Sequence, residues 1–480
     1  MSKLRKLASE TVVYGLGAIL PKLVGFLLVG SFLTFQLKST GQYGVYSILY
    51  AYVTLVFVIF TLRMETAFFK FANDNSYDTK KVYDSSISLV ITSSLVCIVL
   101  LGIFYKQVAA FTVGIENTRY IFYFIAIMFL DALASVPFAK LRHEGKAWKF
   151  SLIKIANSLI TVGLNLFFFL GLPKIKSLAN YYQADYFLDY TFIANLIGST
   201  LVVILLYKEV IGFKFTINKA FMKSLLRFSW PLVIVGIAGA TNQFADRILI
   251  EKYQNSFEAS GLFSGAIKIA VLMNLFVTAF NYASEPFFFK NANASSRKSL
   301  YGSIALAFTI CGMFIYLAVL YYIDIFKFII DPKYWEALYV VPFALMANFI
   351  LGLYYNVSIW YKLSGKTIYG ALIAIIGTCV FLSSSYFLIP AKGIVGASYS
   401  SILCFSIMVV IAYLLGQKHF PIKYPVFKIF AYIVAAISIY FLTELLGWEG
   451  IEKAIYGTLV IVAFIITAYF LDFKKIRAVA

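Results

Sequence analysis

The chain has 480 residues, of which 61% are hydrophobic and only 13% are charged. A soluble domain carries about 25% charged residues, and the apolar runs here reach roughly 20 residues, the length that crosses about 30 Å of hydrocarbon. The formal net charge of +19 does not indicate nucleic acid, because Lys and Arg are scattered singly among the connections rather than gathered in one patch. These numbers exclude a soluble domain and predict an all-α polytopic membrane protein.

The apolar runs, taken in chain order, predict fourteen transmembrane helices. They lie near residues 11–35, 41–69, 83–105, 118–140, 149–171, 187–207, 224–250, 258–289, 299–323, 336–361, 367–389, 393–416, 425–446 and 452–472. Lys and Arg are more frequent in alternate connections. The positive-inside rule therefore places both the N-terminus and the C-terminus in the cytoplasm.

An internal repeat organises these helices. The motif E-x-x-F-F-K-x-A-N occurs at residues 65–73 and again at 285–293, an offset of 220 positions. The same offset aligns Gly41 with Gly261, and the R-x-x-G-K stretch at 142–146 with the K-x-x-G-K stretch at 362–366. Six helices separate equivalent points, so both copies face the same way, as in transporters built from parallel repeats. We predict six-helix bundles over 1–207 and 223–416, followed by two additional helices over 425–472.

Two lysines lie deepest among the cations inside the predicted helices. A cation at the bilayer centre costs about 2.5–3.5 kcal/mol, so each needs a reason to be there. Lys22 and Lys268 each share a helix face with small residues, which leave room for a packed helix or for a ligand. Asp131 is the only deep acid that could pair with them. Two interpretations stay open, a water-filled cavity that receives anions and plain ion pairing in a packed interior.

Other charged residues lie nearer to the helix ends. Arg63 and Glu65 precede the first F-F-K stretch, and Glu285 precedes the second. Either acid could pair with the lysine five residues later, or with a cation in a loop, and anchor its helix end. Arg247 follows Asp246 near the end of the seventh helix.

One face of the fifth predicted helix is polar. It carries Lys154, Asn157, Thr161 and Asn165 at helical spacing. This stripe either lines a cavity or forms hydrogen bonds with another helix.

The sequence has no nucleotide-binding P-loop, zinc motif or nucleophile elbow. We therefore expect no cofactor, no metal and no catalytic activity. An ion gradient, the membrane potential or the supply of substrate would then drive any transport.

Five stretches resemble polysaccharide biosynthesis flippases of the multidrug/oligosaccharidyl-lipid/polysaccharide exporter superfamily. They are L-A-S-E-T-V-V-Y-G-L-G at 7–17, T-G-Q-Y-G-V-Y-S at 40–47, R-M-E-T-A-F-F-K-F at 63–71, R-F-S-W-P-L at 227–232 and S-G-L-F-S-G-A-I-K-I-A at 260–270. The resemblance implies a V-shaped pair of bundles that alternates between inward and outward openings. It also implies flipping of an undecaprenyl-diphosphate-linked oligosaccharide across the bacterial inner membrane, for O-antigen, capsule or similar surface polysaccharide.

The resemblance also implies residue roles and partners. Cations in the cavity would meet the diphosphate, a role that falls here on Lys22, Arg63 and Lys268, with less weight on Arg247. The expected partners are the lipid-linked oligosaccharide, the phospholipid bilayer, and a polysaccharide polymerase and glycosyltransferases, with no nucleic acid. Alternative functions are a cation-coupled drug or metabolite exporter of the same superfamily, a lipid II flippase, and a membrane glycosyltransferase or polymerase.

Overall fold

The computed structural model describes residues 20–21, 23–25, 30–74, 76–175, 183, 186–216, 218–290, 297–448 and 450–473. The side chains at 283, 285–287, 289–290, 297–299 and 473 lie outside that description. Every regular element in the described ranges is helical, so the all-α prediction is confirmed. The chain divides into two compact units, residues 1–248 (unit 1) and 249–480 (unit 2).

Thirteen helices in the described ranges are long and apolar enough to cross a membrane. They span Thr40–Ala72, Thr79–Ile103, Ile115–His143, Ala147–Lys174, Phe187–Leu205, Lys219–Phe244, Phe257–Tyr282, Leu300–Tyr321, Pro332–Leu363, Ile368–Lys392, Ile394–His419, Val426–Leu445 and Gly450–Asp472. Each corresponds to one predicted run, and the protein is a multi-pass membrane protein. The first predicted run, at 11–35, lies largely outside the described residues. The count of fourteen, the cytoplasmic termini and the bundle boundaries therefore remain predictions.

Unit 1 is built around one central helix, α7 (Thr118–His143). Its main helices are α2 (Ser31–Gln36), α3 (Thr40–Thr61), α4 (Met64–Ala72), α5 (Thr79–Ile103), α6 (Tyr105–Thr112), α7 (Thr118–His143), α8 (Ala147–Leu166), α9 (Phe187–Leu205), α10 (Tyr207–Ile211) and α11 (Lys219–Phe244). Helix α7 packs against α3, α4, α5, α6, α8 and α9. Phe192 of α9 is fully buried, and its ring meets Tyr46, Tyr50, Tyr120, Tyr123 and Phe124. These aromatic contacts hold α3, α7 and α9 together.

The second predicted helix, near 41–69, is confirmed as one membrane span over Thr40–Ala72, but the helix is broken within it, between α3 and α4. Leu62 and Arg63 have φ values of 47° and 54°, in the left-handed region that non-glycine residues seldom adopt. The break leaves helix-end carbonyl groups of α3 without a partner in the helix. The Ser93 hydroxyl of α5 donates to the carbonyl of Phe60 at 2.7 Å and satisfies one of them. The sequence has no Gly or Pro at this break, so nothing local predicts it. A hydrogen bond from another helix stabilises it instead.

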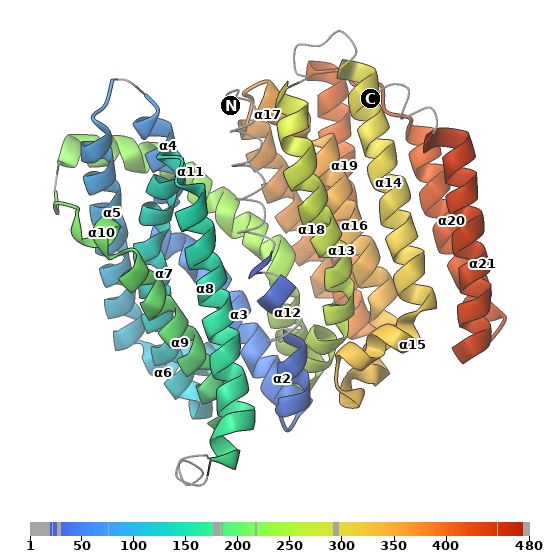
Figure 1. Cartoon of the computed structure of the whole chain (residues 1–480), viewed down its shortest axis with the longest axis horizontal. Helices are drawn as coiled ribbons and strands as arrows, with labels where there is room; N and C mark the ends of the chain where they lie inside the picture. The colour runs from blue at the N-terminus through green and yellow to red at the C-terminus, as the bar shows by residue number, and fades with distance from the viewer. Residues whose placement is uncertain are drawn as a thin grey trace. The chain divides into compact units, whose positions relative to one another are not determined.

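Unit 2 has nine main helical segments. They are α13 (Phe257–Lys290), α14 (Arg297–Tyr321), η8 (Pro332–Val340), α16 (Val341–Val357), α17 (Ile359–Leu363), α18 (Ile368–Lys392), α19 (Ile394–His419), α20 (Val426–Leu445) and α21 (Gly450–Ala468). Helix α16 packs against α13, α14 and α19, and α14 in turn packs against α20 and α21. Figure 1 shows α20 and α21 as a pair beside α14. Trp360 of α17 is fully buried, and its indole N–H donates to the carbonyl of Ala412 at 3.0 Å.

Two glycines of the repeated stretches have the same backbone role. Gly145 ends α7 with φ 70°, and Gly365 follows α17 with φ 70°. A left-handed residue after the last helical turn lets the next amide reach back to an unpaired carbonyl. The amide of Lys146 accordingly donates to the carbonyl of Leu141 at 2.8 Å. Glycine at these positions ends each helix without steric cost.

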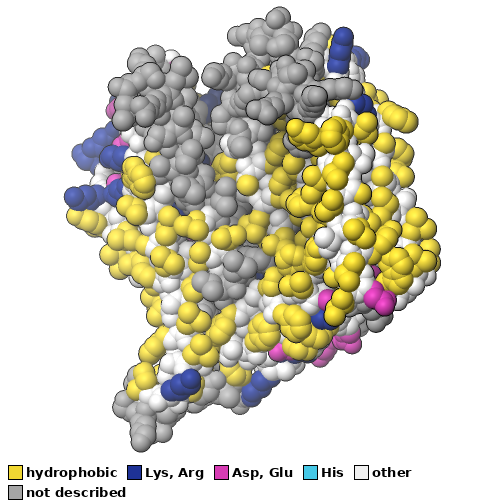
Figure 2. All heavy atoms as spheres, turned by 45° about the vertical axis from the view of Figure 1, so that its right-hand side comes forward, with side chains coloured by type: hydrophobic (Ala, Val, Ile, Leu, Met, Phe, Trp, Pro, Cys, Tyr) yellow, Lys and Arg dark blue, Asp and Glu magenta, His cyan; other side chains and the backbone are white. Residues whose placement is uncertain are grey.

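The surface matches a membrane environment. On the face drawn in Figure 2, Lys, Arg and acidic side chains gather toward the upper and lower ends of the helices, and apolar side chains cover much of the part between. Large exposed apolar residues within spanning helices include Val99, Ile160, Phe387 and Ile465. Lipid rather than water would contact such residues.

Candidate functional site

A pocket of about 430 Å³ lies inside unit 1, among α3, α4, α7, α8 and α9. It is lined by Phe57, Val58, Thr61, Arg63, Glu65, Asp131, Ala134, Ser135, Phe138, Arg142, Phe150, Lys154, Asn157 and Val202. Five of these, Arg63, Glu65, Asp131, Lys154 and Asn157, are candidate residues from the sequence. The fold therefore brings residues from four separate stretches of the sequence into one cavity.

The pocket extends deep into the unit. Arg142 and Phe150 lie at the end where α7 finishes and α8 begins. Asp131 lies about 17 Å from Arg142 along α7 at a rise of 1.5 Å per residue. A hydrocarbon core is about 30 Å thick, so a pocket that reaches Asp131 extends over roughly half of it. Charged residues at such depth face cavities or partners rather than lipid.

Arg63 reaches the pocket because of the helix break. It is the left-handed residue immediately before α4, and its guanidinium lies 3.5 Å from the Glu65 carboxylate. A Cβ atom on Gly236 of α11 would lie 2.7 Å from the Arg63 side-chain nitrogens and 2.9 Å from Val58. The missing side chain at Gly236 thus provides the space in which the guanidinium lies.

Glu65 pairs with Arg63 rather than with the lysine five residues later. The ammonium group of Lys70 lies 4.0 Å from the centre of the Phe228 ring instead. The second carboxylate oxygen of Glu65 is buried and has no hydrogen-bond partner among the described residues. Buried polar atoms normally have a partner. An acceptor of this kind on the pocket wall can receive a hydrogen bond from water or from a ligand.

Lys154 and Asp131 face each other from neighbouring helices. The Lys154 ammonium lies 4.2 Å from the centre of the Phe138 ring, and its charge interacts with that of Asp131. Ser199 of α9 forms a hydrogen bond with the Asp131 carboxylate. Lys154 therefore does not extend to the membrane surface, although its position near the start of α8 would allow that. Its contacts hold its charge at the pocket wall.

The pocket contains charges of both signs, with a formal excess of one positive charge. Its cations are Arg63, Arg142 and Lys154, and its acids are Glu65 and Asp131. The Arg142 guanidinium lies 4.9 Å from the centre of the Phe69 ring. Arginine presents a planar set of donors that suits phosphate oxygens, and lysine supplies a compact point charge. A site with these groups can exchange its internal ion pairs for contacts with an anionic group.

The polar stripe of α8 has two roles along its length. Asn157 lines the pocket. Thr161 donates to the Asn157 side-chain oxygen at 3.5 Å, and a Cβ atom on Gly198 of α9 would lie 2.5 Å from both side chains. Asn165 is fully buried and donates to the carbonyl of Thr161 at 2.7 Å. Thr161 therefore belongs to the α8–α9 packing, Asn165 bonds within α8, and neither residue lines the pocket.

Other candidate residues lie elsewhere. Lys22 is outside the described residues. Lys268 is half-buried in α13, and a Cβ atom on its neighbour Gly265 would lie 2.2 Å from the Tyr334 ring, so a packed aromatic side chain fills that space. Asp246 and Arg247 form an ion pair at 2.9 Å. Glu285 lies in α13, with its side chain outside the described part.

Three polar members of the site are not among the residues predicted from the sequence. Arg142, which the apolar runs place in a connection between helices, lies in the last turn of α7 and lines the pocket. Ser135 of α7 lines the pocket, and Ser199 of α9 binds Asp131. Ser135 lies one helical turn from Asp131, so helical spacing could have indicated it. Ser199 could not be found in that way, since its role depends on the packing of α9 against α7.

Residues 7–292, more than half of the chain, match the family described as "Polysaccharide biosynthesis protein". The chain belongs to this family. The matched region contains every residue of the unit 1 pocket. None of the curated protein sequences matches the chain.

Solved structures of transporters share the fold. The chain is similar to "Lipid II flippase MurJ, inward closed conformation", with a TM-score of 0.74 and 15% identity, over 96% of this chain and 98% of that one. It is also similar to the Vibrio cholerae MATE transporter VcmN in the bent form, with a TM-score of 0.57 and 14% identity, over 86% and 96% of the two chains. The fold is therefore that of flippases and transporters, not of an enzyme.

Proposed function

We propose that this protein flips an undecaprenyl-diphosphate-linked oligosaccharide from the cytoplasmic to the periplasmic leaflet of the bacterial inner membrane. The product would supply surface polysaccharide such as O-antigen, capsule or lipopolysaccharide. One observation carries the proposal: a member of the polysaccharide biosynthesis family has a deep pocket lined by Arg63, Arg142 and Lys154. A diphosphate cannot enter hydrocarbon unless its charge is compensated, and such a pocket can compensate it.

The size of the pocket limits what it can hold. About 430 Å³ falls in the range of small-molecule sites. A diphosphate fits such a volume, whereas an oligosaccharide of several sugars does not. The pocket would therefore bind the charged linkage, while the glycan and the polyprenyl chain lie outside it. Recognition of the linkage alone would leave the sugar sequence unspecified at this site.

The interactions among the pocket charges would make binding reversible. Without substrate, Glu65 lies beside Arg63, and Asp131 interacts with Lys154. With substrate, the cations would turn toward the phosphate oxygens, and an alternating-access change would return them to the acids. Glu65 and Asp131 are also the groups through which an ion could couple to transport. Lys22, Lys268 and, with less weight, Arg247 remain our candidates for later contacts with the diphosphate.

The proposal includes the surroundings of the protein. The bilayer holds it with both termini in the cytoplasm and two six-helix bundles oriented alike. Glycosyltransferases would supply the lipid-linked oligosaccharide, and a polysaccharide polymerase would consume it. We propose no cofactor, no metal and no nucleic-acid partner.

A reconstituted transport assay tests this function. Proteoliposomes that contain the purified chain would be given a fluorescent undecaprenyl-diphosphate oligosaccharide, fluorescent lipid II or a cationic dye. We expect flipping of the first substrate and its loss in Arg63→Ala and Lys154→Ala. Lys146→Ala is the matched control, because it removes a cation that pairs with Glu144 outside the pocket. Flipping of lipid II alone, or export of the dye alone, would replace our proposal with the corresponding alternative.

A further inference from the structure

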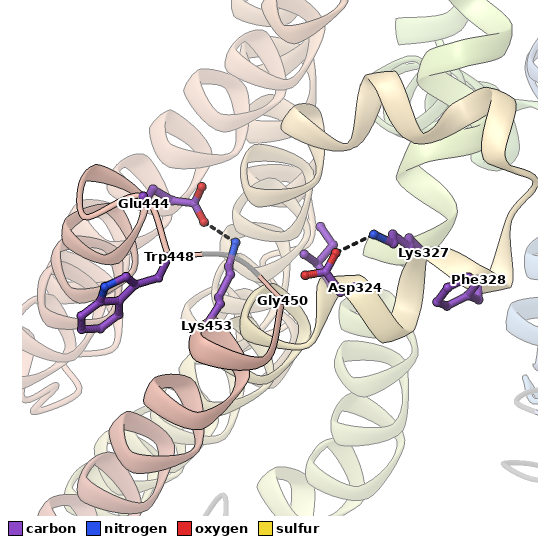
Figure 3. A pocket seen from close by; sticks show the side chains of 9 residues that line it. Asp324, Lys327, Phe328, Glu444, Trp448, Gly450 and Lys453 are labelled. Carbon is purple, nitrogen blue, oxygen red and sulfur yellow. Dashed lines mark hydrogen bonds and ion pairs between the residues drawn. The ribbon is translucent and has the colours of Figure 1, made fainter.

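A second cavity, of about 680 Å³, lies in unit 2 at the turn between α20 and α21. Its wall is formed by the segment after α14, namely α15 (Ile323–Phe326) and η7 (Lys327–Ile329), and by the two helix ends at the turn. The lining residues are Ile323, Asp324, Lys327, Phe328, Glu444, Gly447, Trp448, Gly450 and Lys453. In Figure 3 the Glu444–Lys453 pair and the Asp324–Lys327 pair lie on either side of Gly450.

The cavity lies where membrane-spanning helices end. The spanning helices α14 and α20 finish at Tyr321 and Leu445, and α21 begins at Gly450. This end of unit 2 therefore lies at the boundary between hydrocarbon and headgroups, where Trp is enriched. Trp448 lines the cavity at this level. Its ring centre lies 4.5 Å from that of Tyr456, which fixes the indole at the rim.

Exposed apolar residues in and next to the lining segments are called here the apolar rim. Phe328 lines the cavity and leaves 66% of its surface accessible. Ile325, Leu445 and Ile451, each adjacent in sequence to a lining residue, leave 65%, 83% and 79% of their surfaces accessible. A ligand with acyl chains can cover such residues while its polar part enters the cavity. A soluble sugar has no part that would cover them.

The cavity has a balanced charge. Lys327 donates to Asp324 at 2.6 Å, and Lys453 forms a hydrogen-bonded ion pair with Glu444. Among the described lining residues, two lysines and two carboxylates give no formal net charge. A dianion such as a diphosphate would gain little from such a site, whereas a ligand with one charge of each sign can match both. The charge pattern thus differs from that of the unit 1 pocket.

Exposure shows which charges a ligand would meet first. The carboxylate side chains of Glu444 and Asp324 are 41% and 43% exposed, whereas those of Lys453 and Lys327 are 10% and 24% exposed. The acids therefore face outward, and the lysines lie behind them. An incoming ammonium would meet the acids, and an attached phosphate could then approach the lysines.

We propose that this cavity binds the headgroup of a zwitterionic phospholipid that carries a primary ammonium, such as phosphatidylethanolamine. The ammonium donates hydrogen bonds to Glu444 and Asp324. The phosphate lies toward Lys327 and Lys453, and the acyl chains cover the apolar rim. A quaternary choline group has no N–H to donate, so this site distinguishes the two common zwitterionic headgroups.

Native mass spectrometry of the purified full-length chain tests the proposal. The protein would be mixed with equal amounts of phosphatidylethanolamine, phosphatidylcholine and phosphatidylglycerol. We expect phosphatidylethanolamine to be retained about tenfold more than phosphatidylcholine, the ratio that one charge-assisted hydrogen bond supplies. The double variant Asp324→Asn, Glu444→Gln should lose this preference. Glu144→Gln, which removes an exposed acid of another ion pair in unit 1, should keep it.

Two results would overturn the proposal. Equal retention of the ethanolamine and choline lipids by the wild-type chain would show that the carboxylates receive no hydrogen bond from an ammonium group. This comparison uses the wild-type chain alone, so misfolding of a variant cannot affect it. Displacement of the retained lipid by a soluble oligosaccharide would instead identify a sugar site. The readout is independent of flipping, so a failure here leaves the proposed function unaffected.

Discussion

The second predicted helix of unit 1 and its counterpart in unit 2 differ in one structural respect. In unit 1 the helix breaks at Leu62 and Arg63, and the break directs Arg63 into a pocket. In unit 2, 220 positions later, α13 continues without interruption through Tyr282 and Ala283. The repeated E-x-x-F-F-K stretch follows in both. Within the described residues, the shared helical framework thus carries a left-handed break beside a charged pocket in unit 1 and an unbroken helix at the equivalent positions of unit 2.

The two units also differ in the residues at the pocket positions. Positions 220 residues after Arg63, Asp131, Lys154 and Asn157 are Ala283, Leu351, Ala374 and Gly377. Leu351 and Ala374 are buried, and a Cβ atom on Gly352 would lie 2.4 Å from the Phe308 ring. Apolar packing therefore occupies the positions equivalent to Asp131 and Lys154, whereas the positions equivalent to Glu65 and Arg142 are the charged Glu285 and Lys362. The two copies thus share their helices, and the arrangement of Asp131 with Lys154 belongs to unit 1.

The largest effect is expected from removal of the pocket cations. Arg63→Ala or Lys154→Ala leaves a carboxylate without its cation and removes a contact with the diphosphate. Loss of one charge-assisted contact with the diphosphate during transport is worth about 1.5–3 kcal/mol, which predicts flipping about 10- to 100-fold slower. Rates of fluorescent lipid-linked oligosaccharide flipping in proteoliposomes measure this. Normal rates in both variants would remove the pocket from the mechanism.

Placing a lysine in unit 2, at the position equivalent to Lys154, should destabilise the protein. Ala374→Lys places at the buried equivalent of Lys154 a cation with no acid at the position equivalent to Asp131. Burial of an unpaired charge should destabilise the protein by several kcal/mol and lower its midpoint of thermal unfolding. Size-exclusion thermostability in detergent measures this, with Ala374→Met as the matched control for size. If the lysine variant is as stable as the methionine variant, unit 2 contains a polar site after all.

A smaller effect is expected at the glycine beside Arg63. Gly236→Ala places a methyl group 2.7 Å from the guanidinium nitrogens, so the side chain must move. We expect flipping to fall about tenfold, the cost of misplacing one charge-assisted contact, with normal protein levels. Gly239→Ala is the control, because a Cβ atom there meets nothing within 4 Å. Equal rates in the two variants would show that the position of Arg63 is unimportant.

The smallest effect is expected from the hydroxyl that stabilises the break. Ser93→Ala removes the hydrogen bond to the carbonyl of Phe60, which should cost about 0.5–1.5 kcal/mol of stability. Ser94 also reaches this carbonyl at 3.4 Å, and that second contact should keep the loss near the lower limit. Thermal unfolding of Ser93→Ala and of the double variant with Ser94→Ala measures it. If the double variant is as stable as Ser93→Ala alone, Ser94 contributes nothing to the stability of the break.

Hydrophobic patterning predicts the membrane helices well and the site only in part. Run length identified thirteen described spans, because the bilayer imposes a similar length on each helix. Helical spacing indicated Asn157 and Lys154 together on one face. Neither signal could predict the break at Leu62 and Arg63, which depends on a hydroxyl from α5. Nor could spacing show that Glu65 pairs with Arg63 while Lys70 contacts Phe228, because these choices depend on how helices pack.

The most direct test of the unit 1 pocket is its affinity for a soluble polyprenyl diphosphate of short chain length. Isothermal titration would compare the wild-type chain with the double variant Arg63→Ala, Lys154→Ala and with the control Lys146→Ala. We predict binding at least about 30-fold weaker in the double variant, equivalent to about 2 kcal/mol, and unchanged binding in the control. Equal affinity of the wild-type chain and the double variant would contradict a diphosphate site in this pocket.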